Sequence, residues 1–315
     1  MTTIPDAPVT GTASNGTAVS GARTLASCYL RLAVACEALS VRVTGADGTP
    51  SAAGAPATAS TATGTTVTGT TVTGATVTGA DLAQRPEALE AFVDAESARI
   101  RELQGTAPRR DVAASRALHD YLWSVSLLMS GAWYLERRVP RIRPAEIRLD
   151  LATSVFEITP GSGFACLPGD PAAGSPASGI RVVRDEEALR AELRAAVVDH
   201  MRPLLAAIGP TTRRGPRALW GMTADDLVSG IWYLGRALGQ EERAVSAATD
   251  LLPTAIAPFP GGADFRRLSG REGRRYPTRT RLGCCLYYAL DAARPCATCP
   301  RTCDAERLRR LEDEG

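Results

Sequence analysis

Residues 281–300 read Arg-Leu-Gly-Cys-Cys-Leu-Tyr-Tyr-Ala-Leu-Asp-Ala-Ala-Arg-Pro-Cys-Ala-Thr-Cys-Pro. Cys284 and Cys285 are adjacent, ten residues follow, and Cys296 and Cys299 are then separated by two residues. Four thiolates so close in sequence can meet at one centre through local chain geometry, with little help from a folded scaffold. We therefore predict that this segment forms a metal-binding appendage on the rest of the chain.

The spacing of the four cysteines also indicates which metal centre they bind. A Cys-x-x-Cys turn can chelate one iron of a cluster, and Pro300 matches the Cys-Pro ending of many iron–sulfur loops. Zinc sites usually place two to four residues between paired ligands, which the adjacent Cys284 and Cys285 do not fit. We predict a [2Fe–2S] cluster bound by Cys284, Cys285, Cys296 and Cys299. Structural zinc on the same thiolates is the strongest alternative.

A disulfide-linked tail is the second alternative for these cysteines. The N-terminal residues lack both the basic start and the apolar core of a secretion signal. We therefore expect a cytoplasmic protein, whose thiols stay reduced and available to a metal.

The same segment resembles the C-terminal cluster motif of the FhuF-type ferric-siderophore reductases. The resemblance covers all four cysteines and the flank Cys284-Cys-Leu-Tyr-Tyr288, and more weakly the helical region that follows Trp220. It implies a [2Fe–2S] cluster on the four thiolates and one-electron reduction of cytoplasmic ferric siderophores, with release of Fe(II). Cys303 lies outside the motif, and we interpret it as a bystander, the alternative being a substitute ligand or a protecting thiol.

Two functions from different classes follow from the motif. The first is an enzyme, a ferric-chelate reductase whose electron comes from ferredoxin or a similar donor. The second is a non-catalytic iron–sulfur or zinc protein that binds or senses a siderophore or a redox partner. The chain has no glycine-rich dinucleotide-binding motif after a predicted strand, so we expect the electron to come from a partner protein.

Composition limits the remaining possibilities. The 315 residues carry a net charge of only +2, which argues against nucleic acid as a partner. The longest nearly uncharged helical stretch, 121–135, is shorter than the roughly 20 residues of a membrane span. Peripheral contact with a membrane is kept as an alternative.

We predict a mainly α fold with a small β element (α+β), made of a helical body and a C-terminal cluster-binding appendage. Residues 1–22 are predicted to be disordered, 23–263 to form the body, and 264–315 to form the cluster-binding region. Within the body, residues 45–80 repeat Thr-Val-Thr-Gly with a period that fits neither helix nor strand. We interpret this stretch as a low-complexity insertion without packed structure.

Hydrophobic periodicity, caps and breakers predict the elements of the body. Cys28 and Cys36 fall on the apolar face of the first helix and are expected to be buried. Cys166 stands alone in a loop. The predicted helices are 24–40, 86–104 (closed by Gly105), 111–138, one from Asp185 that bends at Pro203 and ends at Gly209-Pro210, and one from a capping box at Thr223–Asp226 to Gly239; the strands lie within 145–159 and a loop covers 160–179.

Two of these helices share a short repeated sequence, which we call the internal echo. Ser130-Gly-Ala-Trp133-Tyr134-Leu135 recurs as Ser229-Gly-Ile-Trp232-Tyr233-Leu234, and each copy follows another tryptophan. Large aromatic residues at helical spacing are more often core than ligand-binding residues. Whether Trp123, Trp133, Trp220 and Trp232 line a ligand cleft or only the core is left open.

The histidines and the arginines before the cluster motif give weaker indications of function. His119 and His200 show no metal-ligand spacing, so we expect both at the surface or at helix ends. Seven arginines precede the cluster motif and could form a solvated loop or a positive collar that steers an acidic partner or an anionic chelate. They are Arg266, Arg267, Arg271, Arg274, Arg275, Arg279 and Arg281.

Overall fold

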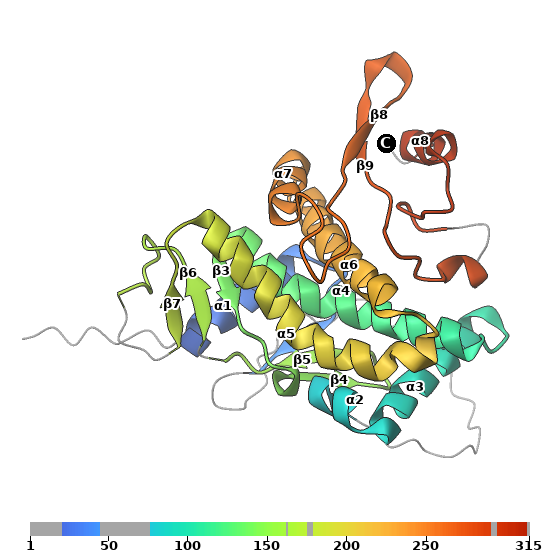
Figure 1. Ribbon diagram of the computed structural model, residues 1–315, viewed down its shortest axis with the longest axis horizontal. Helices are drawn as coiled ribbons and strands as arrows, with labels where there is room; N and C mark the ends of the chain where they lie inside the picture. Colours follow the sequence, from blue (N-terminus) through green and yellow to red (C-terminus); the bar gives the residue numbers. More distant parts are fainter. Residues whose placement is uncertain (1–20, 45–75, 162, 175–178, 291–294, 314–315) are drawn as a thin grey trace, which may run out of the picture.

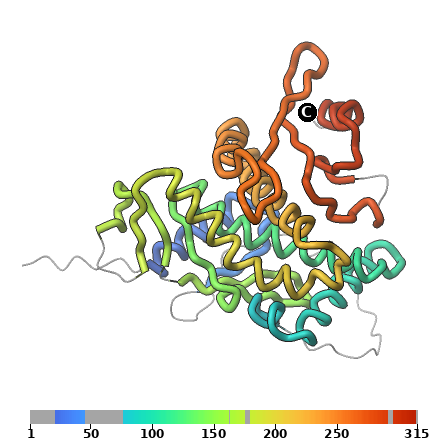
Figure 2. The backbone as a smooth tube through the Cα atoms, in the orientation of Figure 1, coloured from blue at the N-terminus to red at the C-terminus, as the bar shows by residue number. Residues whose placement is uncertain are grey.

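The computed structural model describes residues 21–44, 76–161, 163–174, 179–290 and 295–313. Within these residues the fold is mainly helical with three small sheets, as the sequence predicts. Figures 1 and 2 show a helical body, with a C-terminal arm that extends from one side of it. The helices are α1 (Gly21–Ala35), α2 (Gly79–Gln84), α3 (Pro86–Gln104), α4 (Arg110–Glu136), α5 (Glu186–Thr212), α6 (Pro216–Ala237), α7 (Glu241–Leu251) and α8 (Asp304–Asp313).

Helix α4 lies at the centre of the body. It contacts α1, α3, α5 and α6, and most of its residues between Val112 and Tyr134 are buried. A helix that is apolar on all sides has to be surrounded by other elements, which explains its position. Small residues allow the close approach: a side chain at Gly131 would collide with Leu32 of α1.

Short strands complete the body. They form the sheets β1-β5-β4-β2 and β3-β6-β7, and the arm carries the hairpin β8-β9. The hairpin β4–β5 confirms the strands predicted within residues 145–159. The strands are β1 (Val41–Val43), β2 (Thr76–Thr78), β3 (Arg138–Pro140), β4 (Ile147–Asp150), β5 (Phe156–Ile158), β6 (Phe164–Cys166), β7 (Ile180–Val182), β8 (Arg266–Ser269) and β9 (Arg275–Thr278).

The predicted ends of α3 are confirmed. Pro86 occupies the first turn, where its missing N–H costs nothing, and Gly105 closes the helix with a φ of 76°. The N-cap of α5 is also confirmed, because the Asp185 side chain accepts a hydrogen bond from the Ala188 N–H at 2.8 Å.

The end of α5 was predicted wrongly. The helix continues through Pro203 and Pro210 to Thr212. A proline inside a helix costs about 3 kcal/mol through its lost hydrogen bond and a clash with the preceding turn. Leu204, Leu205 and Ile208 are buried beside these prolines, so apolar burial offsets that cost.

The predicted disordered and low-complexity segments are only partly within the described residues. Helix α1 begins at Gly21, so the segment 1–22 was drawn two residues too long, and residues 1–20 lie outside the described part. Residues 45–75 of the repeat also lie outside it. Its last residues are folded, contrary to prediction: β2 pairs with β4, and Gly79 begins α2 against Tyr121.

The predicted loop 160–179 contains strand β6, which pairs with β3 and β7. Cys166 lies in this strand and is fully buried, as are Cys28 and Cys36 near the N-terminus. The prediction that Cys28 and Cys36 act as small buried apolar residues is confirmed. Among the described helices, none is both long and apolar enough to cross a bilayer.

His200 is buried, which corrects its predicted place at the surface. Its Nδ1–H donates to the Ile142 carbonyl at 2.8 Å, and its Nε2 accepts from the Tyr121 hydroxyl at 2.8 Å. Burial lowers the pKa of His200 to about 4, although the hydrogen bond to Ile142 acts in the opposite direction. The imidazole is therefore neutral in the folded protein at neutral pH.

This buried histidine should make stability fall in mild acid. In the unfolded chain His200 becomes protonated below about pH 6.5. In the folded chain it becomes protonated only near pH 4, so protons bound in between favour the unfolded state. Between pH 6.5 and 5 the free energy of unfolding should therefore drop by about 2 kcal/mol more in the wild type than in His200→Gln. Denaturant titrations of both proteins at several pH values measure this difference, and parallel pH profiles would contradict it.

Candidate metal centre and adjacent groove

The four motif cysteines lie in two segments of the C-terminal arm. Cys284 and Cys285 follow β9, whereas Cys296 and Cys299 precede α8. Cys285 and Cys299 are buried, and Cys284 and Cys296 are partly exposed. The Cys285 and Cys296 thiols interact with each other, so the structure brings the two segments together at these sulfur atoms.

The thiols also interact electrostatically. The interaction between the two side chains lowers the pKa of Cys285 and raises that of Cys296. Burial raises the pKa of Cys284, and charge on Cys285 or Cys299 would raise it further. Each of the four thiols therefore lies within interaction range of two of the others.

The donor set can be compared with the two predicted metal centres. Within the described residues, no three His, Cys, Asp or Glu side chains converge as ligands of a single ion. A [2Fe–2S] cluster instead takes four thiolates. Two cysteine pairs that interact across two segments, without a carboxylate among them, fit that cluster in number and chemistry. Its presence stays a prediction.

The segment before the cysteines is joined to α6 by buried ion pairs. The Arg279 guanidinium donates to Asp225 at 2.6 Å, and both side chains are fully buried. Asp225 also accepts the backbone N–H of Leu282 at 3.0 Å and of Gly283 at 2.7 Å. Gly283 is required here, since a side chain would crowd Met222 of α6. One carboxylate therefore fixes the backbone that leads directly into Cys284.

A second carboxylate, Asp226, extends this network to α4. Arg281 donates to it at 2.7 Å, and the His119 Nδ1 lies 2.9 Å from it. Burial alone would raise the pKa of Asp226, but Arg281 and His119 lower it below its usual value. His119 is thus half-buried: it contacts the buried carboxylate on one side and lines an open groove on the other.

The predicted capping box at Thr223–Asp226 was also wrong, because these residues do not lie at the start of a helix. Helix α6 begins at Pro216, and Leu219 and Trp220 are already buried in its first turns. Thr223, seven residues into the helix, donates its hydroxyl hydrogen bond back to the Leu219 carbonyl. Asp225 and Asp226 are consequently in the middle of a helix, where they bind arginines distant in sequence instead of the N–H groups at a helix start.

Arg307 of α8 supports the second cysteine pair, a role that no local pattern of residues indicates. Its buried guanidinium donates to the carbonyls of Ala297 at 3.1 Å, Cys299 at 2.9 Å and Thr302 at 3.2 Å. A planar guanidinium with five N–H groups can satisfy several carbonyls at once. It therefore fixes the Cys-x-x-Cys turn to α8.

The predicted arginine collar is only partly at the surface. Arg279 and Arg281 are buried in the network described above, because Asp225 and Asp226 compensate their charges. Most of the others lie on the β8–β9 hairpin that projects in Figure 1. Three of these are paired with carboxylates distant in sequence: Arg266 with Asp304, Arg267 with Glu242, and Arg271 with Glu312.

An open groove of about 380 Å³ adjoins the thiol segments. Helices α4 and α6 form its walls, and the arm contributes Arg281 and Thr298, the residue that directly precedes Cys299. The backbone N–H of Arg281 donates to the Thr298 carbonyl at 3.0 Å, which joins the two cysteine segments at the groove. Its lining residues are His119, Asp120, Trp123, Ser229, Trp232, Tyr233, Arg236, Arg281 and Thr298.

The four tryptophans divide between groove and core. Trp123 and Trp232 line the groove. Trp133 is buried, and Trp220 packs edge-to-face on Phe259. The two copies of the internal echo therefore differ: Tyr134 in α4 is buried, whereas Tyr233 in α6 is exposed at the groove.

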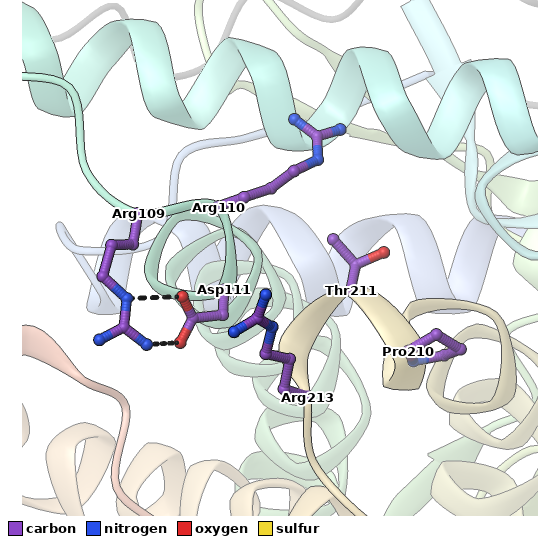
Figure 3. Close-up of a pocket in the computed structure, with 6 residues that line it drawn as sticks. All are labelled: Arg109, Arg110, Asp111, Pro210, Thr211 and Arg213. Carbon is purple, nitrogen blue, oxygen red and sulfur yellow. Dashed lines mark hydrogen bonds and ion pairs between the residues drawn. The ribbon is translucent and has the colours of Figure 1, made fainter.

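A larger cavity, of about 520 Å³, lies where the start of α4 meets the end of α5 (Figure 3). Its arginines are largely neutralised, since Arg109 binds Asp111 in a bidentate pair and Arg110 binds Glu90 and Asp94. None of the four cysteines lines it. Size alone therefore does not make it the functional site.

Comparison of the chain with known proteins finds no matching family model and no matching curated protein. The function is therefore inferred from the cysteine motif and from the geometry of the arm.

Replacing Asp225 should loosen the cysteine segment. In Asp225→Asn, the Arg279 charge stays buried without its partner, a change that typically costs about 3–5 kcal/mol. We expect a lower free energy of unfolding by denaturant titration and less iron in the purified protein. Asp199→Asn, at an exposed carboxylate of α5, should change stability by less than about 0.5 kcal/mol. Equal iron content in both variants would show that Asp225 does not support the site.

Proposed function

We propose that this protein is a cytoplasmic ferric-siderophore reductase, an oxidoreductase that holds a [2Fe–2S] cluster on Cys284, Cys285, Cys296 and Cys299. The observation that carries the proposal is the set of four interacting thiols on the arm, whose residues Arg281 and Thr298 line an open groove. The resemblance of the motif to the FhuF-type reductases supports the substrate class. No acid–base residue is required, since the reaction adds one electron to the substrate iron.

The chemistry follows from the two oxidation states of iron. Hard oxygen ligands hold Fe(III) tightly, whereas Fe(II) is softer and exchanges its ligands readily. The bound cluster would supply one electron at a time. Fe(III) in the chelate gains that electron and becomes Fe(II), and the freed siderophore oxygens take protons from water. An electron donor of low potential, such as reduced ferredoxin, restores the electron.

The protein residues around the site would position these reactants. Asp225 and Arg279 fix the first cysteine pair, and Arg307 fixes the second. The backbone N–H of Leu286 donates to the Cys284 sulfur at 3.4 Å, and the positive charge of Arg116 interacts with Cys285. Hydrogen bonds to sulfur stabilise the more negative state and so raise the reduction potential of a cluster.

The cofactor assignment is tested by replacing cysteines singly with serine. Each change at Cys284, Cys285, Cys296 or Cys299 should lower iron and sulfide content sharply, because each removes one of four ligands. Cys303→Ser is the matched control from the same arm, and its content should equal that of the wild type. Iron and sulfide analysis with EPR of anaerobically purified protein measures the outcome. A wild type that contains one zinc and no sulfide would exclude the cluster.

The activity is tested with reduced ferredoxin as donor and ferric siderophore as acceptor. Fe(II) captured by a chromogenic chelator should appear at a rate that falls at least about tenfold in Cys296→Ser, since the electron relay is lost. If a reduced cluster is not reoxidised by any ferric siderophore, the second candidate applies: an iron–sulfur protein that binds or senses a siderophore or a redox partner.

A further inference from the structure

We propose that Arg281 is a positioning residue of the metal centre, and that its side-chain Nε–H donates a hydrogen bond to a sulfur atom of the cluster that the thiols bind. This inference rests on the proposed function and assigns one of the groups that set the reduction potential of the cluster. It is carried by a buried N–H group that has no partner and lies where the two cysteine segments meet.

The first observation is the position of Arg281 between the two cysteine segments. It lies three residues before Cys284 in the sequence, and its backbone N–H donates to the Thr298 carbonyl at 3.0 Å. Thr298 directly precedes Cys299. The backbone of one cysteine segment is therefore bonded to the backbone of the other at Arg281.

The second observation concerns the guanidinium group of Arg281. Its Nη2 donates to Asp226 at 2.7 Å and lies 3.4 Å from the His119 Nδ1. Its Nε is buried and has no hydrogen-bond partner among the residues that the structure describes. An oxygen of Asp225 lies 3.7 Å from Nε, which is too long for a hydrogen bond.

A buried N–H group without an acceptor lowers the stability of a protein, because it has left water and formed no bond in exchange. Although Arg281 lines the groove, its side chain is only 5% exposed, and the Nε atom is closed to solvent. Native proteins contain few such groups. An acceptor that a bound cofactor supplies would account for this one.

The electrostatic interactions of Arg281 indicate where that acceptor lies. Burial alone would lower the pKa of Arg281, but the carboxylates of Asp226 and Asp225 raise it above its ordinary value. Negative charge on Cys285 or Cys296 raises it further. The guanidinium group therefore interacts with one thiol from each cysteine segment. Sulfur atoms of iron–sulfur clusters accept hydrogen bonds, which supplies the missing partner.

The expected consequence is a higher reduction potential of the cluster. Reduction adds negative charge that the sulfur atoms share, so a hydrogen bond to them favours the reduced state. The Asp226 carboxylate already balances the positive charge of Arg281. Lysine at position 281 would separate the two contributions: its Cε methylene takes the place of Nε, and its ammonium group can still pair with Asp226.

The test uses the full chain with its cluster, grown with arginine that carries the heavy stable isotope of nitrogen at Nε alone. Pulsed EPR of the reduced cluster should detect a hyperfine coupling to this nitrogen, because a hydrogen bond transmits unpaired spin to its donor. The coupling should disappear in Arg281→Lys. At a fixed potential the ratio of reduced to oxidised cluster should also fall about fivefold, as for the loss of one hydrogen bond. A redox titration followed by EPR measures this ratio.

Arg279→Lys is the matched control. Arg279 is buried in the same network two residues earlier, but its Nε donates to the Ala263 carbonyl at 2.9 Å. This replacement should lower the free energy of unfolding, because it removes a buried hydrogen bond, and should leave the hyperfine coupling unchanged. Loss of stability alone is thereby distinguished from loss of the hydrogen bond to the cluster.

A reduced wild-type cluster without coupling to arginine nitrogen would overturn the inference, even if Arg281→Lys binds no cluster. An unchanged coupling in Arg281→Lys would overturn it as well. Reduction of ferric siderophore by a protein that lacks the coupling counts against this inference alone. The coupling without any turnover counts against the proposed reductase alone, and a wild type that binds zinc refutes both.

Discussion

The ion pair between Arg279 and Asp225 is the interaction on which the C-terminal arm depends. Both charges are fully buried, so each is costly without the other. Asp225 uses its remaining lone pairs on two backbone N–H groups that precede the cysteines, and this satisfies the carboxylate while fixing the chain. Helix α6, which carries Asp225 and packs on α4, thereby determines where the thiol segment lies.

Two further sets of contacts attach the cysteine segments to other helices. Arg281 and Asp226 connect the arm to His119 of α4, and Arg307 connects the Cys-x-x-Cys turn to α8. The cysteine segments have little regular secondary structure of their own, apart from the short 3-10 helix at Tyr287–Ala289. Guanidinium groups, with their fixed planar sets of N–H donors, supply the order that helix or sheet hydrogen bonds would otherwise give.

Local sequence signals predicted the parts of the fold that depend on neighbouring residues. Helix α3 was delimited by Pro86 and Gly105, because a first-turn proline and a left-handed glycine act within one turn. The four cysteines of the candidate site were identifiable because their spacing is itself local. Asp225 and Asp226 were misassigned to a cap, since their partners lie more than fifty residues away and no periodicity reveals them. Whether the aromatic residues line a cleft or only the core was left open for the same reason: the tertiary fold decides that Tyr233 is exposed and Tyr134 is buried.

The attachment of the thiol segment by Asp225 has a consequence for cofactor assembly. The contacts that fix Leu282 and Gly283 use the protein backbone and α6, and none of them involves a sulfur atom. The backbone that leads into the first cysteine pair is therefore fixed by the protein alone. If the proposed cluster binds here, a newly synthesised chain would present it with two ligands on a backbone that is already ordered.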